Sequence, residues 1–154
     1  PSLELNKKPS FSDFKKASIT NFIRKASLRI RAYQPNCIIS AAVKPNLIDA
    51  KKVFHQEWDE WLIGEYIDWA ILMNYTSNTR NFENNIQIIR DNLPKKYLNN
   101  ILMGIGVYNQ NYKSASEKIN ITIRNKFAGY SLFSYTVFKK DTDSIKKLQK
   151  LQEK

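Results

Sequence analysis

Side chains that could bind a ligand follow the four apolar runs of this chain. The runs span residues 37–43, 67–74, 101–107 and 129–135, and the residues at their ends are Lys44, Asn74, Tyr75, Tyr108, Ser134 and Tyr135. Amide, ammonium and hydroxyl groups form hydrogen bonds, and tyrosine rings offer flat apolar faces with a polar tip. The carboxyl ends of parallel strands meet at one edge of a sheet, so we expect these six residues to form a binding rim.

The rim lacks the acids that hydrolytic chemistry needs, because no Asp or Glu stands at the carboxyl end of any run. Asp68 lies at the start of its run, where we expect a structural hydrogen-bonding role. Glu57, Asp59 and Glu60 belong to a segment of helical pattern and are predicted to lie on its solvated side or to cap it. We therefore assign no catalytic residue.

Nucleophile and metal chemistry find no better support. Ser134 has no visible base partner. The one histidine, His55, is expected to cap a helix or to lie at the surface, and the one cysteine, Cys37, is expected to be an inert buried thiol. One His and one Cys do not make a zinc site, and we predict no metal and no cofactor.

Helical and extended patterns alternate along the chain. Apolar residues recur at helical spacing over about 17–33, 82–93 and 114–127, and a further amphipathic segment begins at residue 55. Its tryptophans, with the one that opens the next run, are expected to pack between helix and strand: Trp58, Trp61 and Trp69. The alternation predicts an α/β fold with four parallel strands joined by right-handed, helix-bearing connections.

The 154 residues, 42% of them hydrophobic, predict one domain. We expect an arm or loop over 1–16, the α/β domain over 17–138 with a loop at about 46–54, and a basic tail over 139–154 that is expected to be helical.

Small residues recur on one face of the predicted strands. In the first and third strands they alternate with large apolar residues, at 40 and 42 and at 104 and 106. In the second strand we assign Trp69, Ile71 and Met73 to the helix-covered face and Asn74 to the opposite face. A sheet with one narrow face fits a curved barrel better than an open doubly wound sheet, which needs apolar bulk on both faces. This arrangement places Lys44, Asn74 and Tyr108 inward at one rim.

The formal net charge of +11 raises the question of a nucleic-acid partner. The basic residues are spread along the chain, are densest in the tail, and come with no recognised nucleic-acid motif, so we expect a solvated basic exterior and no nucleic acid. No apolar run is long enough to cross a bilayer, and no membrane span is expected.

The segments HQEWDEWL, YIDWAILMNYT, ILMGIGVY and GYSLFSY, in this order and spacing, resemble the carboxyl-terminal half of the bacterial glycoside-hydrolase-like (β/α)8 barrels, also described as family-10 glycosyl-hydrolase-like proteins. The resemblance covers about residues 13–138. It implies a half TIM-type barrel made of the fifth to eighth strands. The acidic Asp-Tyr-x-Arg-like motif that the family carries at the end of its fourth strand has no counterpart here.

The resemblance implies a glycoside-hydrolase-like barrel that acts on or binds a glycan such as a cell-envelope polysaccharide, at the cell envelope or outside the cytoplasm. Because ordinary glycosidases need two carboxyls, the chain is expected to be inactive alone, and whether it belongs to an enzyme stays open. The alternative is a non-catalytic carbohydrate-binding or protein-interaction module. A half barrel has two edge strands with unpaired backbone groups, which predicts a homodimer or pairing with the missing amino-terminal half.

Overall fold

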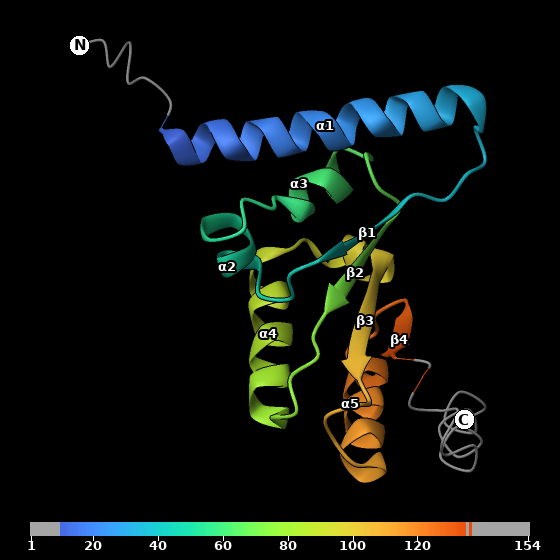
Figure 1. Cartoon of the computed structure of the whole chain (residues 1–154). Coiled ribbons are helices and arrows are strands. Elements are labelled where there is room, and N and C mark those ends of the chain that lie inside the picture. Colours follow the sequence, from blue (N-terminus) through green and yellow to red (C-terminus); the bar gives the residue numbers. More distant parts are fainter. Residues whose placement is uncertain (1–9, 135, 137–154) are drawn as a thin grey trace.

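The computed structural model describes residues 10–134 and residue 136 (Figure 1). The predicted tail over 139–154, residues 1–9 of the predicted arm, and Tyr135 lie outside this range. The elements follow one another as α1 (Phe11–Tyr33), β1 (Ser40–Val43), α2 (Leu47–Lys52), α3 (Trp58–Ile63), β2 (Trp69–Met73), α4 (Thr79–Asn92), a 3-10 helix η1 (Lys95–Asn100), β3 (Ile101–Gly106), α5 (Tyr112–Arg124) and β4 (Gly129–Phe133).

The four strands form one parallel sheet in which spatial order follows sequence order, β1-β2-β3-β4. Val43 is aligned with Leu72 in β2, and Leu72 is aligned with Met103 in β3. The predicted fold of four parallel strands that alternate with helices is therefore confirmed, although each strand is shorter than its apolar run.

Helices cover one face of this sheet. On that face Leu72, Met103 and Ile105 have no exposed surface and share a core with Ile89 of α4 and Ile119 of α5. Alternate residues of the same strands point to the other face, where side chains keep part of their surface: Trp69, Ile71, Met73, Leu102 and Phe133. Within the described residues the second face is left uncovered, and we call it the open face.

The predicted faces are correct for β1 and β3 and wrong for β2. Trp69, Ile71 and Met73 lie on the open face, and Ala70 and Leu72 pack beneath the helices. Every residue of β2 is apolar, so its sequence shows no alternation of polar and apolar side chains. The alignment of Leu72 with Met103 instead decides which residues of β2 face the helices. Trp69, expected between helix and strand, is accordingly 37% exposed.

Helix α1 begins at Phe11 and not near residue 17, so the predicted arm is too long. Ser10 and Asp13 form a capping box: the Ser10 hydroxyl accepts from the Asp13 N–H, and the Asp13 carboxylate accepts from the Ser10 N–H. Figure 1 shows α1 lying across the end of the sheet at which β2 and β3 begin. The indole of Trp61 in α3 donates to the Thr20 hydroxyl at 2.9 Å and ties the two helices together.

Two predictions on the segments that flank β1 are wrong. The expected loop at 46–54 contains α2, which begins because the Asn46 side chain accepts from the N–H groups of Ile48 and Asp49. Cys37 is exposed and not buried, because β1 begins only at Ser40.

Candidate functional site

Three aromatic rings meet on the open face at the carboxyl ends of β2, β3 and β4. The rings of Tyr75 and Phe133 are stacked, with centroids 4.9 Å apart and planes 12° from parallel. The Tyr108 ring stands nearly perpendicular to Phe133 at 6.1 Å. Tyr108 is 53% exposed and Phe133 49%, so this aromatic cluster of Tyr75, Tyr108 and Phe133 presents ring surface to solvent.

Two glycines in β3 leave room for the cluster. A Cβ at Gly104 would lie 2.9 Å from the Tyr75 ring and 2.4 Å from the Leu72 carbonyl oxygen, and a Cβ at Gly106 would lie 3.2 Å from both Tyr75 and Tyr108. Real Cβ atoms essentially never lie closer than 3.0 Å to a non-bonded heavy atom. Tyr75 therefore lies flat on the sheet because the strand beneath it carries no side chain at these positions.

Lys118 of α5 holds together the two loops that carry the tyrosines. Its ammonium is fully buried and donates to the carbonyls of Thr76 and Ser77, after β2, at 2.8 and 2.9 Å. It also donates to the side chain of Gln110, after β3, whose amide in turn donates to the Gly106 carbonyl. A compact cation with three donors thus fixes the backbone next to Tyr75 and next to Tyr108.

A direct link joins the same loops, because the Asn109 amide donates to the Tyr75 carbonyl at 2.8 Å. Burial, together with the neighbouring Tyr108, raises the pKa of the Tyr75 hydroxyl above its usual value. Burial lowers the pKa of the Lys118 ammonium, and the nearby Glu117 carboxylate partly offsets this. The tyrosine hydroxyl is therefore a neutral hydrogen-bonding group at physiological pH, suited to polar but uncharged ligands.

Asn74 is not at the rim, contrary to the sequence prediction. It is 1% exposed and lies on the helix side of the sheet, where its amide donates to the Phe82 carbonyl at 3.3 Å and its oxygen accepts from Asn85 at 2.9 Å. Its place follows from the phase of β2, since Leu72 and Asn74 share a face. Asn74 joins β2 to α4 and turns its side chain away from the open face.

Of the other predicted rim residues, only the two tyrosines that the structure describes belong to the aromatic cluster. Tyr75 and Tyr108 are brought together as expected. The Lys44 ammonium lies over the Phe54 ring, 4.3 Å from its centroid, and away from the aromatic cluster. The Ser134 hydroxyl lies 2.7 Å from that of Thr136, next to Phe133 through a cis peptide bond, and Tyr135 is outside the described residues.

Sequence reasoning missed Phe133. Its apolar run, GYSLFSY, alternates small residues at 129 and 131 with larger ones, so the small positions mark the phase that lies on the open face. Phe133 shares this phase, and its register opposite Gly106 places its ring beside those that lie over the glycines. The alternation of small residues was the available signal.

Two acids of the described chain, Asp68 and Asp59, serve the scaffold. Asp68 at the amino end of β2 accepts from the Ile39 N–H at 2.7 Å and from Arg31 at 2.9 Å, which confirms its structural role. Burial raises its pKa, but these donors and the arginine charge outweigh burial and hold the pKa below the usual value. Asp59, expected on the solvated side, is instead 5% exposed and paired with Lys51.

The remaining sequence candidates lie in or just before α3, away from the aromatic cluster. Glu57 occupies the N-cap position of α3 but makes no side-chain cap. His55 is half-buried, and one ring nitrogen lies 3.4 Å from the Ser12 hydroxyl of α1. Trp58 and Trp61 pack in the core as expected.

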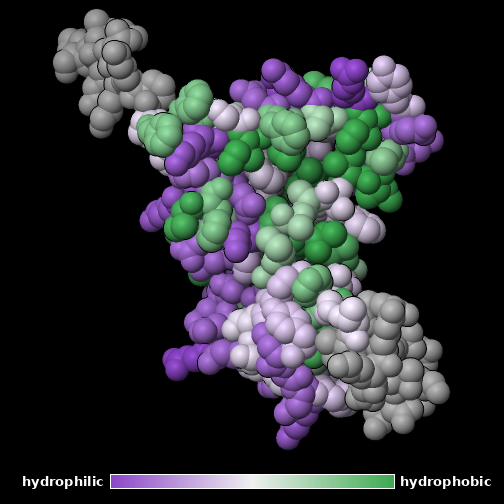
Figure 2. Space-filling view, viewed as in Figure 1, coloured by the Kyte–Doolittle hydropathy of each residue, from purple (hydrophilic) through white to green (hydrophobic). Residues whose placement is uncertain are grey.

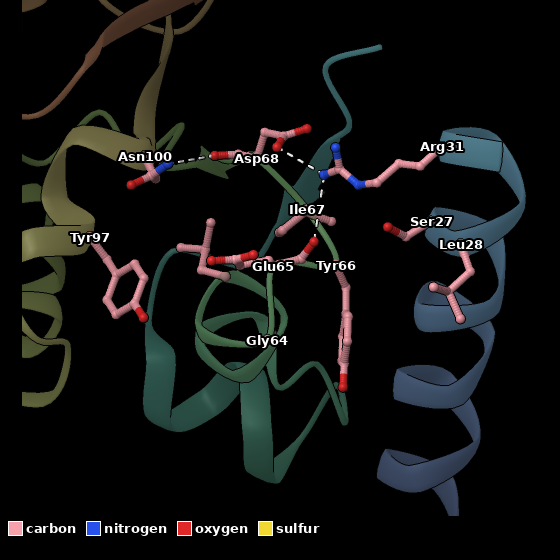
Figure 3. A pocket seen from close by; sticks show the side chains of 11 residues that line it. Ser27, Leu28, Arg31, Gly64, Glu65, Tyr66, Ile67, Asp68, Tyr97 and Asn100 are labelled. Atoms are coloured by element: carbon pink, nitrogen blue, oxygen red, sulfur yellow. Dashed lines mark hydrogen bonds and ion pairs between the residues drawn. The ribbon is translucent and has the colours of Figure 1, made fainter. Parts of the chain in front are cut away.

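A second candidate site is a cavity of about 560 Å³ at the amino end of the sheet, between α1 and the residues that precede β2 and β3 (Figure 3). Arg31 reaches from α1 into it and donates to Asp68, and the Asn100 amide donates to the Asp68 carbonyl at 2.9 Å. Figure 3 shows the Tyr66 and Tyr97 rings at its border. Arg31 and Asp68 are engaged with each other, and Arg31 also donates to the Glu65 backbone carbonyl at 3.5 Å, so we interpret the cavity as the joint between α1 and the sheet.

Metal chemistry has no candidate within residues 10–134, where no three His, Cys, Asp or Glu side chains are grouped to hold an ion. No helix in the described part of the chain has the length and apolar character that crossing a membrane requires. Comparison of the chain with protein-family models, with curated proteins and with solved structures finds no match.

Proposed function

We propose that this chain is part of a glycoside-hydrolase-like (β/α) barrel and contributes an aromatic glycan-binding surface to its carboxyl-end rim. The observation that carries the proposal is the aromatic cluster of Tyr75, Tyr108 and Phe133. Sugar rings expose apolar C–H faces edged by hydroxyls, and exposed aromatic rings with hydroxyl tips match both features.

The sheet supports a barrel segment. Strand order follows the sequence and the helices cover one face, as in a barrel, where the other face turns inward. An open doubly wound sheet reverses its order and buries both faces. The open face is narrow at Gly104 and Gly106, which suits the limited interior of a barrel. In this proposal the outer edges of β1 and β4 pair with strands of a complementary half.

In this proposal the rim binds the glycan and supplies no pair of carboxyl groups for acid–base catalysis. Glycosidases place two carboxyl groups about 5–10 Å apart around the scissile bond. Among the described residues, Asp68 lies at the opposite end of β2 and Asp59 is occupied by Lys51. Any catalytic carboxylates of the assembled barrel come from its other strands, and this chain alone binds glycans without turning them over.

A protein-interaction module is the second candidate, and the exposure of Trp69 on the open face favours it. Trp69 lies at the amino end of β2, away from the aromatic cluster, and its ring offers contact area to a polypeptide. In that case β1 would accept a partner strand at its free edge.

Binding of soluble oligosaccharides tests the proposal. We would titrate the protein with chito-, cello- and xylo-oligosaccharides by NMR and calorimetry. Tyr108→Ala and Phe133→Ala should each weaken binding about fivefold, because a stacked ring contributes on the order of 1 kcal/mol. Tyr108→Phe keeps the ring and should retain most of the affinity.

Tyr33→Ala is the matched control, since Tyr33 is an exposed tyrosine on α1, far along the chain from the cluster. Absence of binding to every oligosaccharide, or equal losses in Tyr33→Ala and Tyr108→Ala, would reject the glycan site. Hydrolysis by the protein that vanishes in Asp68→Asn would show that the acids were misassigned.

A further inference from the structure

Helix α1 turns an aromatic and basic face away from the rest of the molecule. Phe11, Phe22 and Tyr33 are 71%, 69% and 74% exposed. Their spacing of eleven residues advances the helix by only about 20° per step, so they form one line along its length. The side chains that hold α1 to the body, Thr20 and Arg31, lie on the opposite side.

Most residues beside this line are apolar or basic. Within about 140° of the helix circumference, the face also carries four exposed side chains of these two kinds, Phe14, Leu28, Lys25 and Arg29, and the uncharged residues Ser18, Asn21 and Ala32 lie between them. Leu28 stands at the edge of this face and also lines the cavity of Figure 3. Lys15 belongs to the face as well, with its ammonium 4.4 Å from the centre of the Phe11 ring. We call the eight aromatic, leucine and basic residues of this set the outer face of α1.

The outer face contains no acid. The one acid of α1, Asp13, lies on the other side, where it is bound to Ser10 in the capping box and lies 3.7 Å from Lys16. Figure 2 shows green apolar and purple hydrophilic side chains interspersed along the band that α1 forms at the top of the view. Apolar rings and cations without anions are complementary to a surface that is apolar beneath and negatively charged above.

We propose that the outer face of α1 docks the protein on an anionic lipid membrane. A helix of 23 residues is about 34 Å long. It is straight in Figure 1, so its aligned rings can all enter the interface of a flat bilayer at once. Lys15, Lys25 and Arg29 then lie at the level of the phosphate groups and are attracted by the negative surface potential.

The same face fits nucleic acid less well. Single strands are bound in grooves where successive bases stack on aromatic rings, and a convex helix face offers no groove. Reading of duplex DNA by a helix relies on Arg, Lys, Asn and Gln side chains at the base edges, whereas this side of α1 carries five large Phe, Leu and Tyr side chains beside its three cations and Asn21. The chemistry of the face therefore favours lipid.

Vesicle sedimentation with the full chain tests the proposal. We expect the protein to sediment with vesicles of phosphatidylglycerol and phosphatidylcholine and to stay in solution with phosphatidylcholine alone. Two variants separate the contributions: Phe11→Ser with Phe22→Ser removes inserted rings, and Lys25→Glu with Arg29→Glu reverses charge. Each should weaken partitioning about tenfold or more, the second most strongly at low salt.

Matched variants elsewhere provide the controls. Lys113→Glu with Arg124→Glu on α5 makes the same change in net charge, and Val53→Ser with Ile123→Ser removes exposed apolar side chains outside α1. These should change partitioning less than about threefold, because they leave the docking face intact. Thermal melts by circular dichroism check that all variants fold.

Three results would overturn the proposal. The first is no sedimentation with anionic vesicles, and the second is equal loss in the outer-face variants and their controls. The third is that the protein binds a single-stranded oligonucleotide but not vesicles, and that the double variant Lys25→Glu with Arg29→Glu loses this binding. That result would assign the face to nucleic acid. Sugar binding plays no part in these outcomes.

Discussion

Asn74 is the residue for which the sequence and the structure make opposite predictions about stability. As a rim residue it would contribute little to folding. In the structure it is 1% exposed and joins β2 to α4 through the Phe82 carbonyl and the Asn85 amide. Asn74→Ala removes both hydrogen bonds, at about 1 kcal/mol each, and leaves a small cavity that costs about another 1 kcal/mol. We expect a loss of about 2–4 kcal/mol in the free energy of unfolding.

Urea denaturation followed by circular dichroism measures this loss. The midpoint should fall while the slope stays unchanged, and the melting temperature should drop by about 5–12 °C. Asn84→Ala is the matched control, because Asn84 is an exposed asparagine on α4. Its stability should stay within about 0.5 kcal/mol of the parent, since alanine also favours helix.

The reasoning fails if Asn74→Ala unfolds within about 0.5 kcal/mol of the parent. If that variant also lost affinity for an oligosaccharide that Asn84→Ala still binds, Asn74 would belong to the ligand site after all. The phase assigned to β2 would then be wrong, together with the position of Tyr75.

Further predictions concern β3 and the amino end of the sheet. Gly104→Ala should lower the free energy of unfolding by at least about 2 kcal/mol, because its Cβ would lie 2.4 Å from the Leu72 carbonyl oxygen. Gly129→Ala should lower it by less than about 1 kcal/mol, because its Cβ would meet only the flexible end of the Leu102 side chain at 3.3 Å. Equal urea midpoints for the two variants would contradict this prediction. The second prediction concerns the dependence of stability on pH. The pKa of Asp68 is lowered in the folded protein, so the contribution of its carboxylate to stability is present above about pH 4 and is lost as the pH falls further. The stability difference between the parent and Asp68→Asn should therefore shrink in acid, and a difference that grows there would refute the assignment.

The sequence predicts the class of fold because strands and helices differ in apolar period and length. It also predicts which face of β3 is covered, since Met103 and Ile105 alternate with glycines. It does not predict the phase of β2, whose side chains are all apolar. A shift by one residue exchanges the two faces of a strand, and that error alone moved Asn74 to the rim.

Short-range signals that would have improved the prediction are present in the chain. The pattern Ser10-x-x-Asp13 is a capping box that marks the start of α1. Asn46 marks the start of α2 as an N-cap residue, whose side chain accepts from the N–H groups of Ile48 and Asp49. Lys118 is different, because a lysine on a helix is expected in solvent. Only its place beside Ala115 and Ile119 on the buried side of α5 indicates that it points inward.

The position of Lys118 bears on how an exposed site can be rigid. Tyr75 and Tyr108 lie on loops, and loops without internal packing are mobile. Here the buried Lys118 ammonium donates to two backbone carbonyls after β2 and to the Gln110 side chain after β3. The ammonium lies on the helix-covered side of the sheet, opposite the rings. The energy of burying the ammonium is offset only while all three acceptors are in place, so the two loops are fixed together. Within the part of the chain that the structure describes, the open face can therefore present ordered rings to a ligand without a second layer of protein above them.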